Sequence, residues 1–172
     1  YLKRLHEKVN EIRQKGAAPF IAKIQDPPYY SILKDLEEHL RQCVMKELGM
    51  LDIKWLKTRV PEGLLKKWEE RKTKRESPYP WLSVIEYHLL CYADFSDYVG
   101  IICRRDNWRD AFEKIFSDRQ TLSSKLRELE PIRNDIAHSR ELSEEAVKIL
   151  GLYAEQIINA IDGVTRNSSK SS

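Results

Sequence analysis

The chain has 172 residues, of which 41% are hydrophobic and 33% are charged, and its formal net charge is +3. This composition is typical of a globular protein and excludes a largely disordered chain. No apolar run reaches the length of about 20 residues that a membrane-spanning helix needs, so no membrane segment is predicted. Three cysteines without the spacing of a disulfide framework favour a reducing, cytoplasmic location. The chain does not begin with Met, and we expect it to be part of a longer protein.

The apolar residues are spaced for helices. Only 6 glycines and 7 prolines occur, and the alternation typical of strands is missing, so the sequence predicts an all-α fold. Residues 1–28 are expected to form an N-terminal helix and a linker that ends in Asp26-Pro27-Pro28, a sequence that interrupts helices. The next helix is expected from Tyr29 to about Leu48, with its apolar side chains on one side.

The stretch 54–75 is rich in positive charge. It holds nine Lys or Arg residues against three Glu, an excess that would attract a polyanion such as RNA. Trp55 and Trp68 could serve there as stacking platforms for bases, but packing on the core is the favoured interpretation for both. For the Lys and Arg residues, two interpretations stay open: they bind RNA, or they form the solvated face of a helix. The predicted RNA-binding residues are Lys54, Lys57, Arg59, Lys66, Lys67 and Arg71, with Arg104 and Arg105 of a second basic group.

The segment from Trp81 to about Cys103 is apolar on nearly all sides, which is typical of a central, buried helix. A further helix is expected to end at Phe116, and Asp106 or Asn107 can cap its beginning.

Two more helices complete the predicted bundle. Ser117-Asp118-Arg119-Gln120 has the Ser-x-x-Gln pattern of a capping box and predicts a helix that runs towards His138. Ser143, followed by two Glu residues, predicts the start of the last helix, which ends near Ile161. We therefore expect a bundle of four to five core helices over residues 29–163, with 54–75 as a basic helical insertion and 164–172 as a disordered tail.

The segment Arg133–His138 combines groups that suit phosphate chemistry. On a helical wheel of about 100° per residue, Asn134 and His138 are neighbours on the polar side, and Arg133 lies at the edge of the apolar stripe. An imidazole can accept and release a proton near neutral pH, and a guanidinium offers a fork of donors to a phosphate. The alternative is structural: Arg133 pairs with Glu130 or Asp135, and His138 caps the helix end.

The pattern Arg-Asn-x-x-x-His near the end of a helix resembles the signature of the HEPN superfamily (higher eukaryotes and prokaryotes nucleotide-binding domains). The stretches 40–48, 81–108 and 126–140 are similar to one branch, found in prokaryotic defence-type multidomain proteins and in a nuclear RNA-quality-control endonuclease. The resemblance covers roughly residues 29–162. It implies a homodimer in which two Arg/His motifs meet in one cleft, and other domains of a longer parent protein as partners.

Active members of this superfamily are metal-independent endoribonucleases, in which a ribose 2′-hydroxyl attacks the adjacent phosphate and leaves a 2′,3′-cyclic phosphate. The resemblance implies that His138 is the general base or acid. It further implies that Arg133 binds the phosphate and the transition state, and that Asn134 orients the His or the phosphate. Asp135 and Ser139 would have supporting roles.

Two other functions stay open. One is a catalytically silent module that binds RNA or protein, or dimerises a larger defence or regulatory protein, and the other is nucleotide-binding regulation. In a toxin branch of the superfamily that the chain resembles, a partner nucleotidyltransferase modifies a Tyr two residues after the His. Here that position is Arg140, so this kind of regulation is not expected. No cofactor and no metal are predicted. His39/Cys43 and His88/Cys91 have the spacing of zinc ligands, but buried cysteines and hydrogen-bonded histidines are the favoured interpretation.

Overall fold

The computed structural model of the protein describes residues 27–76 and 88–168, and every regular element within these ranges is a helix. The all-α prediction is therefore confirmed. The N-terminal helix expected within residues 1–28 lies outside the described residues. None of the described helices combines the length and the hydropathy of a membrane span. The elements are α3 (Pro28–Leu51), α4 (Trp55–Arg59), α5 (Glu62–Glu76), the 3-10 helix η2 (Leu89–Tyr92), α6 (Phe95–Ile102), α7 (Arg105–Asn107), the π-helical turn η3 (Trp108–Phe112), α8 (Glu113–Phe116), α9 (Arg119–Ala137) and α10 (Glu144–Ser168).

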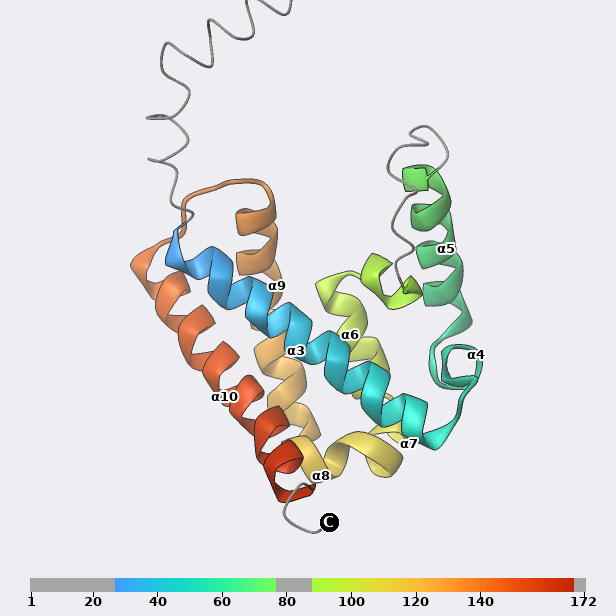
Figure 1. The fold of residues 1–172 in the computed structure, drawn as a ribbon. Coiled ribbons are helices and arrows are strands. Elements are labelled where there is room, and N and C mark those ends of the chain that lie inside the picture. Colours follow the sequence, from blue (N-terminus) through green and yellow to red (C-terminus); the bar gives the residue numbers. More distant parts are fainter. Residues whose placement is uncertain (1–26, 77–87, 169–172) are drawn as a thin grey trace, which may run out of the picture.

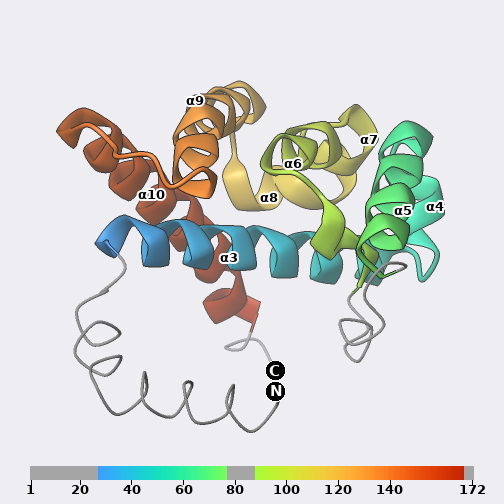
Figure 2. The same ribbon diagram turned by 90° about the horizontal axis from the view of Figure 1, so that it is seen from above.

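Helix α3 is the central element of the bundle. It crosses one face of the molecule, and α9, α6 and α5 stand side by side along it (Figures 1 and 2). Helix α10 packs on α3 more extensively than any other pair of described elements. Helix α9 also packs against α6 and α10, so these helices enclose a common core and confirm the predicted helical bundle.

The core takes one apolar stripe from each main helix. The stripe of α9 is the one that the helical wheel predicted, and the helix continues through Pro131 without a break. Fully burying a side chain of the size of Leu contributes about 1.5–3 kcal/mol to stability, so these stripes hold the helices together. The buried residues include Leu36, Leu40 and Val44 of α3, Leu122, Leu126, Leu129, Ile132 and Ile136 of α9, and Leu150, Ala154 and Ile157 of α10.

The long helix predicted from Trp81 to Cys103 is wrong in its described part. From residue 88 onwards the chain forms η2, leaves helical geometry at Ala93 and starts α6 at Phe95. The backbone N–H of Asp94 donates to Oδ2 of Asp97 at 2.8 Å, an interaction typical of the first turn of a new helix. The uniform apolar pattern around these two aspartates concealed this start signal.

Helix α5 is fastened to the start of α6 by charged side chains. Asp97, which is only 5% exposed, accepts hydrogen bonds from Trp68 Nε1 at 2.8 Å and from Lys67 Nζ at 3.0 Å. Arg71 donates to Asp94 Oδ2 at 2.6 Å, and this hydrogen bond, with help from Lys67, lowers the pKa of Asp94 to about 2. Since Trp68 is completely buried, α5 belongs to the core, and the packing interpretation of this Trp is confirmed.

The helix expected to start at Asp106 or Asn107 begins at Arg105 instead and contains the π-helical turn η3. Asn107 is completely buried, so it cannot act as an exposed cap. Its Nδ2 donates to the carbonyl oxygens of Arg59 and Ile101, both at 2.8 Å, which ties α4 to the end of α6.

The capping box predicted at Ser117 and Gln120 is also wrong. Ser117 adopts a left-handed conformation with φ of 60°, and Asp118 is the N-cap of α9. The carboxylate of Asp118 accepts a hydrogen bond from the backbone N–H of Thr121, which satisfies one of the free amides of the first turn.

The last helix starts as predicted, because Ser143 Oγ accepts a hydrogen bond from the backbone N–H of Ala146 at 3.2 Å. It does not end near Ile161. Helix α10 continues to Ser168 and so includes part of the stretch 164–172 that the sequence predicted to be disordered. Ile161 and Val164 pack against the core, which gives the extra turns a tertiary partner.

Candidate functional site

The predicted segment Arg133–His138 lies at the C-terminal end of α9, next to the N-terminal half of α3. Tyr30 Oη donates to the carbonyl oxygen of Ile136 at 3.4 Å, and Arg133 Nε donates to Glu37 Oε1 at 3.3 Å. Both contacts join residues about a hundred positions apart in the chain. The site is therefore built by two helices, and sequence analysis identified only one of them.

Arg133 is half-buried and held by α3. Its Nε pairs with Glu37, and its Nη1 lies 3.5 Å from Asn134 Oδ1. Neither Glu130 nor Asp135, the partners considered from the sequence, forms this pair, and Asp135 binds Arg140 instead at 3.0 Å. A guanidinium has five N–H donors, so these two contacts leave donors for a phosphate.

His138 ends α9 as its C-cap residue. Its backbone N–H donates to the carbonyl oxygen of Asn134 at 3.1 Å. The side chain is exposed, and its ring has no hydrogen-bond or ion-pair partner among the described residues. The helical-wheel prediction that His138 points away from the apolar stripe is confirmed. The backbone of His138 caps the helix, whereas its imidazole is free to contact another molecule.

A rigid turn holds His138 at the helix end. The N–H of Ser139 donates to the carbonyl oxygen of Ile136 at 3.0 Å, and the N–H of Arg140 donates to that of Asp135 at 2.9 Å. These two bonds form a Schellman motif, in which Ser139 takes the left-handed conformation with φ of 55°. Asp135 and Ser139, predicted as supporting residues, thus fix the backbone beside His138.

A pocket of about 320 Å³ opens between α3 and α9. Such a volume is within the usual range for small-ligand sites. Arg133 lines the pocket, whereas Asn134 and His138 are not among its described lining residues. The sequence did not identify the residues on the α3 side of the pocket. A Tyr, a Lys and a Glu on one face of a helix are too common a pattern to indicate a site. The lining residues are Tyr30, Leu33, Lys34 and Glu37 of α3, with Arg133, Ile136, Ala137 and Ser139.

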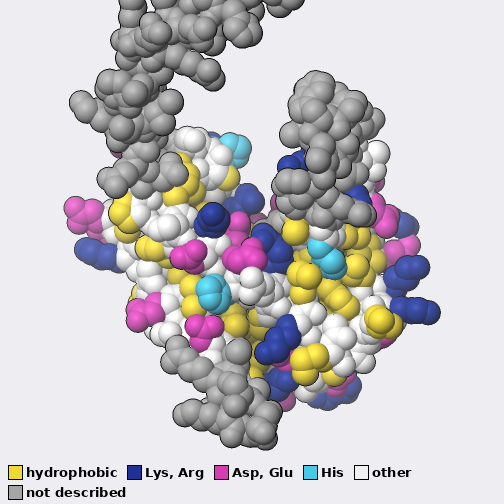
Figure 3. All heavy atoms as spheres, in the orientation of Figure 1, with side chains coloured by type: hydrophobic (Ala, Val, Ile, Leu, Met, Phe, Trp, Pro, Cys, Tyr) yellow, Lys and Arg dark blue, Asp and Glu magenta, His cyan; other side chains and the backbone are white. Residues whose placement is uncertain are grey.

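Most of the predicted RNA-binding cations are paired within the protein. Arg59 binds Asp110 at 2.7 Å and Arg104 binds Asp106 at 2.8 Å, while Lys67 and Arg71 hold Asp94. Lys66 pairs with Glu62 at 2.7 Å on the surface of α5. On the face that α3 crosses, basic and acidic side chains are interspersed and form no extended basic area (Figure 3). Among the predicted RNA-binding residues, the exposed ones without an ion pair to a described residue are Lys54, Lys57 and Arg105.

These cations also lie far from Arg133. Helix α3 has 24 residues and is therefore about 36 Å long. The predicted site adjoins its N-terminal half, whereas α4 and α5 follow its C-terminal end (Figure 1). The structure therefore does not bring the basic stretch 54–75 together with the Arg/His segment.

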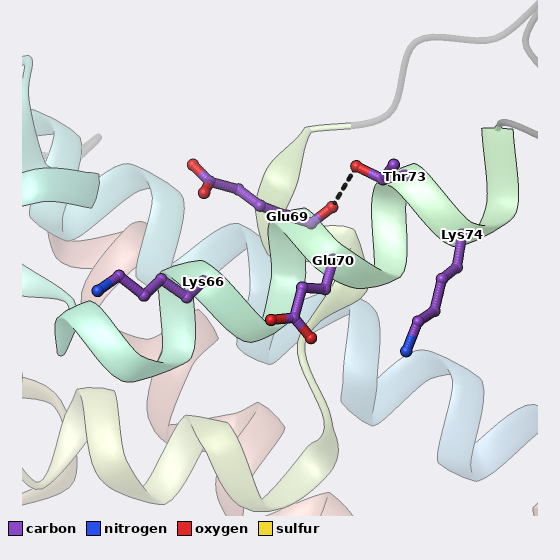
Figure 4. A pocket seen from close by; sticks show the side chains of 5 residues that line it. All are labelled: Lys66, Glu69, Glu70, Thr73 and Lys74. Atoms are coloured by element: carbon purple, nitrogen blue, oxygen red, sulfur yellow. Dashed lines mark hydrogen bonds between the residues drawn. The ribbon is translucent and has the colours of Figure 1, made fainter.

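A second hollow, of about 450 Å³, runs along α5 and is lined by Lys66, Glu69, Glu70, Thr73 and Lys74. The side chains of these residues leave the helix in different directions (Figure 4). Thr73 Oγ1 donates to the carbonyl oxygen of Glu69 at 2.9 Å, and the two Lys are balanced by two Glu. Because no polar groups converge here, this hollow is not a candidate site.

The cysteines and histidines with zinc-like spacing are accounted for mostly by packing. Cys43 is buried, and burial raises the pKa of its thiol to about 12. His39 Nδ1 lies 2.7 Å from the carbonyl oxygen of Asp35, and the ring of His88 accepts a hydrogen bond from the N–H of Leu90. Cys91 is exposed, so the expectation that it is buried is wrong. Among the described residues, no group of three or more possible ligands could hold a metal ion.

The family model described as STY4199-like HEPN matches residues 86–170, a range that includes the whole Arg133–His138 segment. The chain contains a HEPN domain. The resemblance inferred from the Arg-Asn-x-x-x-His pattern is thereby confirmed at the level of the superfamily. Helix α3, which supplies half of the pocket, precedes the matched range of this HEPN domain. No curated protein and no solved structure matches the chain significantly.

Proposed function

We propose that this HEPN domain is a metal-independent endoribonuclease, in which Arg133 of one copy and His138 of a second copy act on the same phosphate. The observation that carries the proposal is that one end of α9 presents both an exposed imidazole, His138, and a half-buried guanidinium, Arg133. Membership of the HEPN superfamily supports this class of reaction.

A second copy is needed because the two groups diverge within one chain. Residues five positions apart on a helix point about 140° away from each other. Arg133 accordingly lines the pocket between α3 and α9, whereas His138 does not. A second copy placed against this end of α9 would bring its own His138 to the pocket that holds Arg133.

The chemistry needs only groups of the protein and the RNA. The imidazole of His138 takes the proton from a ribose 2′-hydroxyl as the 2′-oxygen attacks the phosphorus. The bond between phosphorus and the 5′-oxygen breaks, and the imidazolium returns a proton to that oxygen. The products are a 2′,3′-cyclic phosphate and a 5′-hydroxyl. Arg133 binds the non-bridging oxygens and stabilises the negative charge that develops on them.

The test is incubation of a labelled single-stranded RNA with the wild-type chain in excess EDTA, followed by identification of the product ends. We expect cleavage with 2′,3′-cyclic phosphate and 5′-hydroxyl ends. RNA with 2′-O-methyl groups throughout should resist, because it lacks the nucleophile. The proposal is contradicted if the RNA stays intact at a protein concentration that saturates binding, or if cleavage requires a divalent metal and leaves 3′-hydroxyl ends.

One observation favours the alternative of an assembly module. Met50 and Ile53, at the turn between α3 and α4, are 69% and 92% exposed, and hydrophobic side chains are visible on this side of the molecule (Figure 3). Clustered exposed apolar residues commonly mark protein contacts. Because this turn lies at the end of α3 remote from Arg133, a contact there and cleavage at α9 are compatible.

A further inference from the structure

The pocket beside Arg133 continues along α3. A neighbouring hollow, of about 340 Å³ and distinct from the one along α5, is lined by Pro27, Tyr30, Ser31 and Lys34 at the beginning of α3. Tyr30 and Lys34 line both hollows. The two hollows therefore adjoin at Tyr30 and Lys34, and we call the surface that they line between Arg133 and Pro27 the α3 groove.

The α3 groove contains a cation that no described residue neutralises. Lys34 is exposed and makes no ion pair with any described residue. Glu37 lines the same pocket, but its Oε1 is engaged with Arg133 Nε at 3.3 Å. Lys34 and Arg133 thus offer two separate positive groups along the groove, which suits a ligand with successive phosphates.

The α3 groove also contains an aromatic ring that is held in place. The rings of Tyr29 and Tyr30 are stacked, with their centroids 5.3 Å apart and an angle of 25° between their planes. The hydroxyl of Tyr30 is tied to the carbonyl oxygen of Ile136 in α9 at 3.4 Å. A ring fixed on two sides loses little freedom when a flat ligand packs against it, and every nucleobase has such a face.

We propose that the α3 groove binds the nucleotide next to the scissile phosphate of a single-stranded RNA, with Lys34 on its phosphate and Tyr30 against its base. This inference rests on the proposed function, because it takes Arg133 as the group that holds the scissile phosphate. It also defines the substrate class. A base can stack on a protein ring only when it is unpaired, so double-stranded RNA is a poor ligand for the groove.

The test measures binding separately from cleavage. A fluorescent single-stranded RNA with 2′-O-methyl groups throughout can bind but cannot be cut, and its affinity follows from fluorescence anisotropy with the full chain. Lys34→Ala and Tyr30→Leu should each weaken binding about five- to tenfold, because each removes one phosphate or one stacking contact. Tyr30→Phe keeps the ring and should bind nearly as well as the wild type. The corresponding duplex should bind more weakly than the single strand.

The matched control is Lys46→Ala, an exposed lysine on the same helix that lines neither hollow. Its affinity for the RNA should equal that of the wild type. Lys34→Glu provides a second variant that leaves the core untouched, and it should bind more weakly than Lys34→Ala because it adds a repulsive charge.

The outcomes distinguish this inference from the ribonuclease proposal. Suppose that the wild type cuts RNA and that the Lys34 and Tyr30 variants match Lys46→Ala in both affinity and cleavage rate. The inference about the α3 groove is then overturned, and the ribonuclease proposal stands. If binding depends on Lys34 and Tyr30 but unmodified RNA is never cut, the groove is supported and the ribonuclease proposal fails. A wild type that does not bind the modified RNA contradicts the groove directly.

Discussion

His138→Ala should lower the rate of RNA cleavage in EDTA by a factor of about 10² to 10⁴, the usual contribution of a general acid or base. The variant loses the group that takes the proton from the 2′-hydroxyl, and no other described side chain hydrogen-bonds to this ring. Because the side chain is exposed, the melting temperature should stay close to that of the wild type. Single-turnover kinetics and a thermal melt measure the two effects.

His39→Ala is the matched control. His39 is also a surface histidine, but it lies on α3 and its ring nitrogen binds the carbonyl oxygen of Asp35. We expect this variant to cut RNA at the wild-type rate. If His138→Ala cuts within about twofold of the wild type under the same conditions, the role of His138 in proton transfer is wrong.

Arg133→Ala should lower the cleavage rate about 10²- to 10³-fold, comparable with the loss of one donor to the developing oxyanion in other enzymes. Arg133→Lys should recover only part of this loss, because an ammonium cannot bind two phosphate oxygens in the planar geometry of a guanidinium. Single-turnover rates at saturating protein measure the effect on the chemical step.

The stability of the Arg133 variants should change little. The ion pair with Glu37 involves side chains that are 29% and 28% exposed, and such pairs contribute about 0–1 kcal/mol. Arg127→Ala removes an exposed arginine from the same helix and serves as the matched control. Equal cleavage rates for Arg133→Ala and Arg127→Ala would mean that Arg133 does not stabilise the transition state.

The sequence predicted α9 well because one periodicity dominates it. The five apolar residues from Leu122 to Ile136 recur at helical spacing, and the structure buries all of them. That stripe also determines which residues face away from the core, so the exposure of His138 followed from the wheel. The Arg-x4-His pattern then indicated the HEPN superfamily, which the family model confirms.

Two features could not be read from the sequence because they depend on tertiary contacts: the partners of the basic stretch and the break in the apolar segment. A charge count over 54–75 shows nine cations but not their partners, and Asp94 and Asp97 lie some twenty-five residues further along the chain. The break before α6 depends on the same two aspartates. Hydrophobic periodicity shows which face of a helix is apolar. It does not detect a carboxylate that starts a new helix inside an apolar run.

The α3 side of the site could not be predicted from the sequence for a similar reason. Tyr30, Lys34 and Glu37 meet Arg133 only because α3 packs beside α9, about a hundred residues away in sequence. In the sequence they are ordinary surface residues of an amphipathic helix. Without the fold, no pattern links them to the Arg/His segment.

The proposed shared site is tested most directly by mixing His138→Ala with Arg133→Ala after each has been shown to be inactive alone. Each mixed dimer contains one site with Arg133 from the first variant and His138 from the second, so RNA cleavage should return. Mixing His138→Ala with the double variant His138→Ala/Arg133→Ala should restore nothing. If the first mixture stays inactive although labelled subunits exchange between dimers, Arg133 and His138 do not act across two copies and the proposed site is wrong.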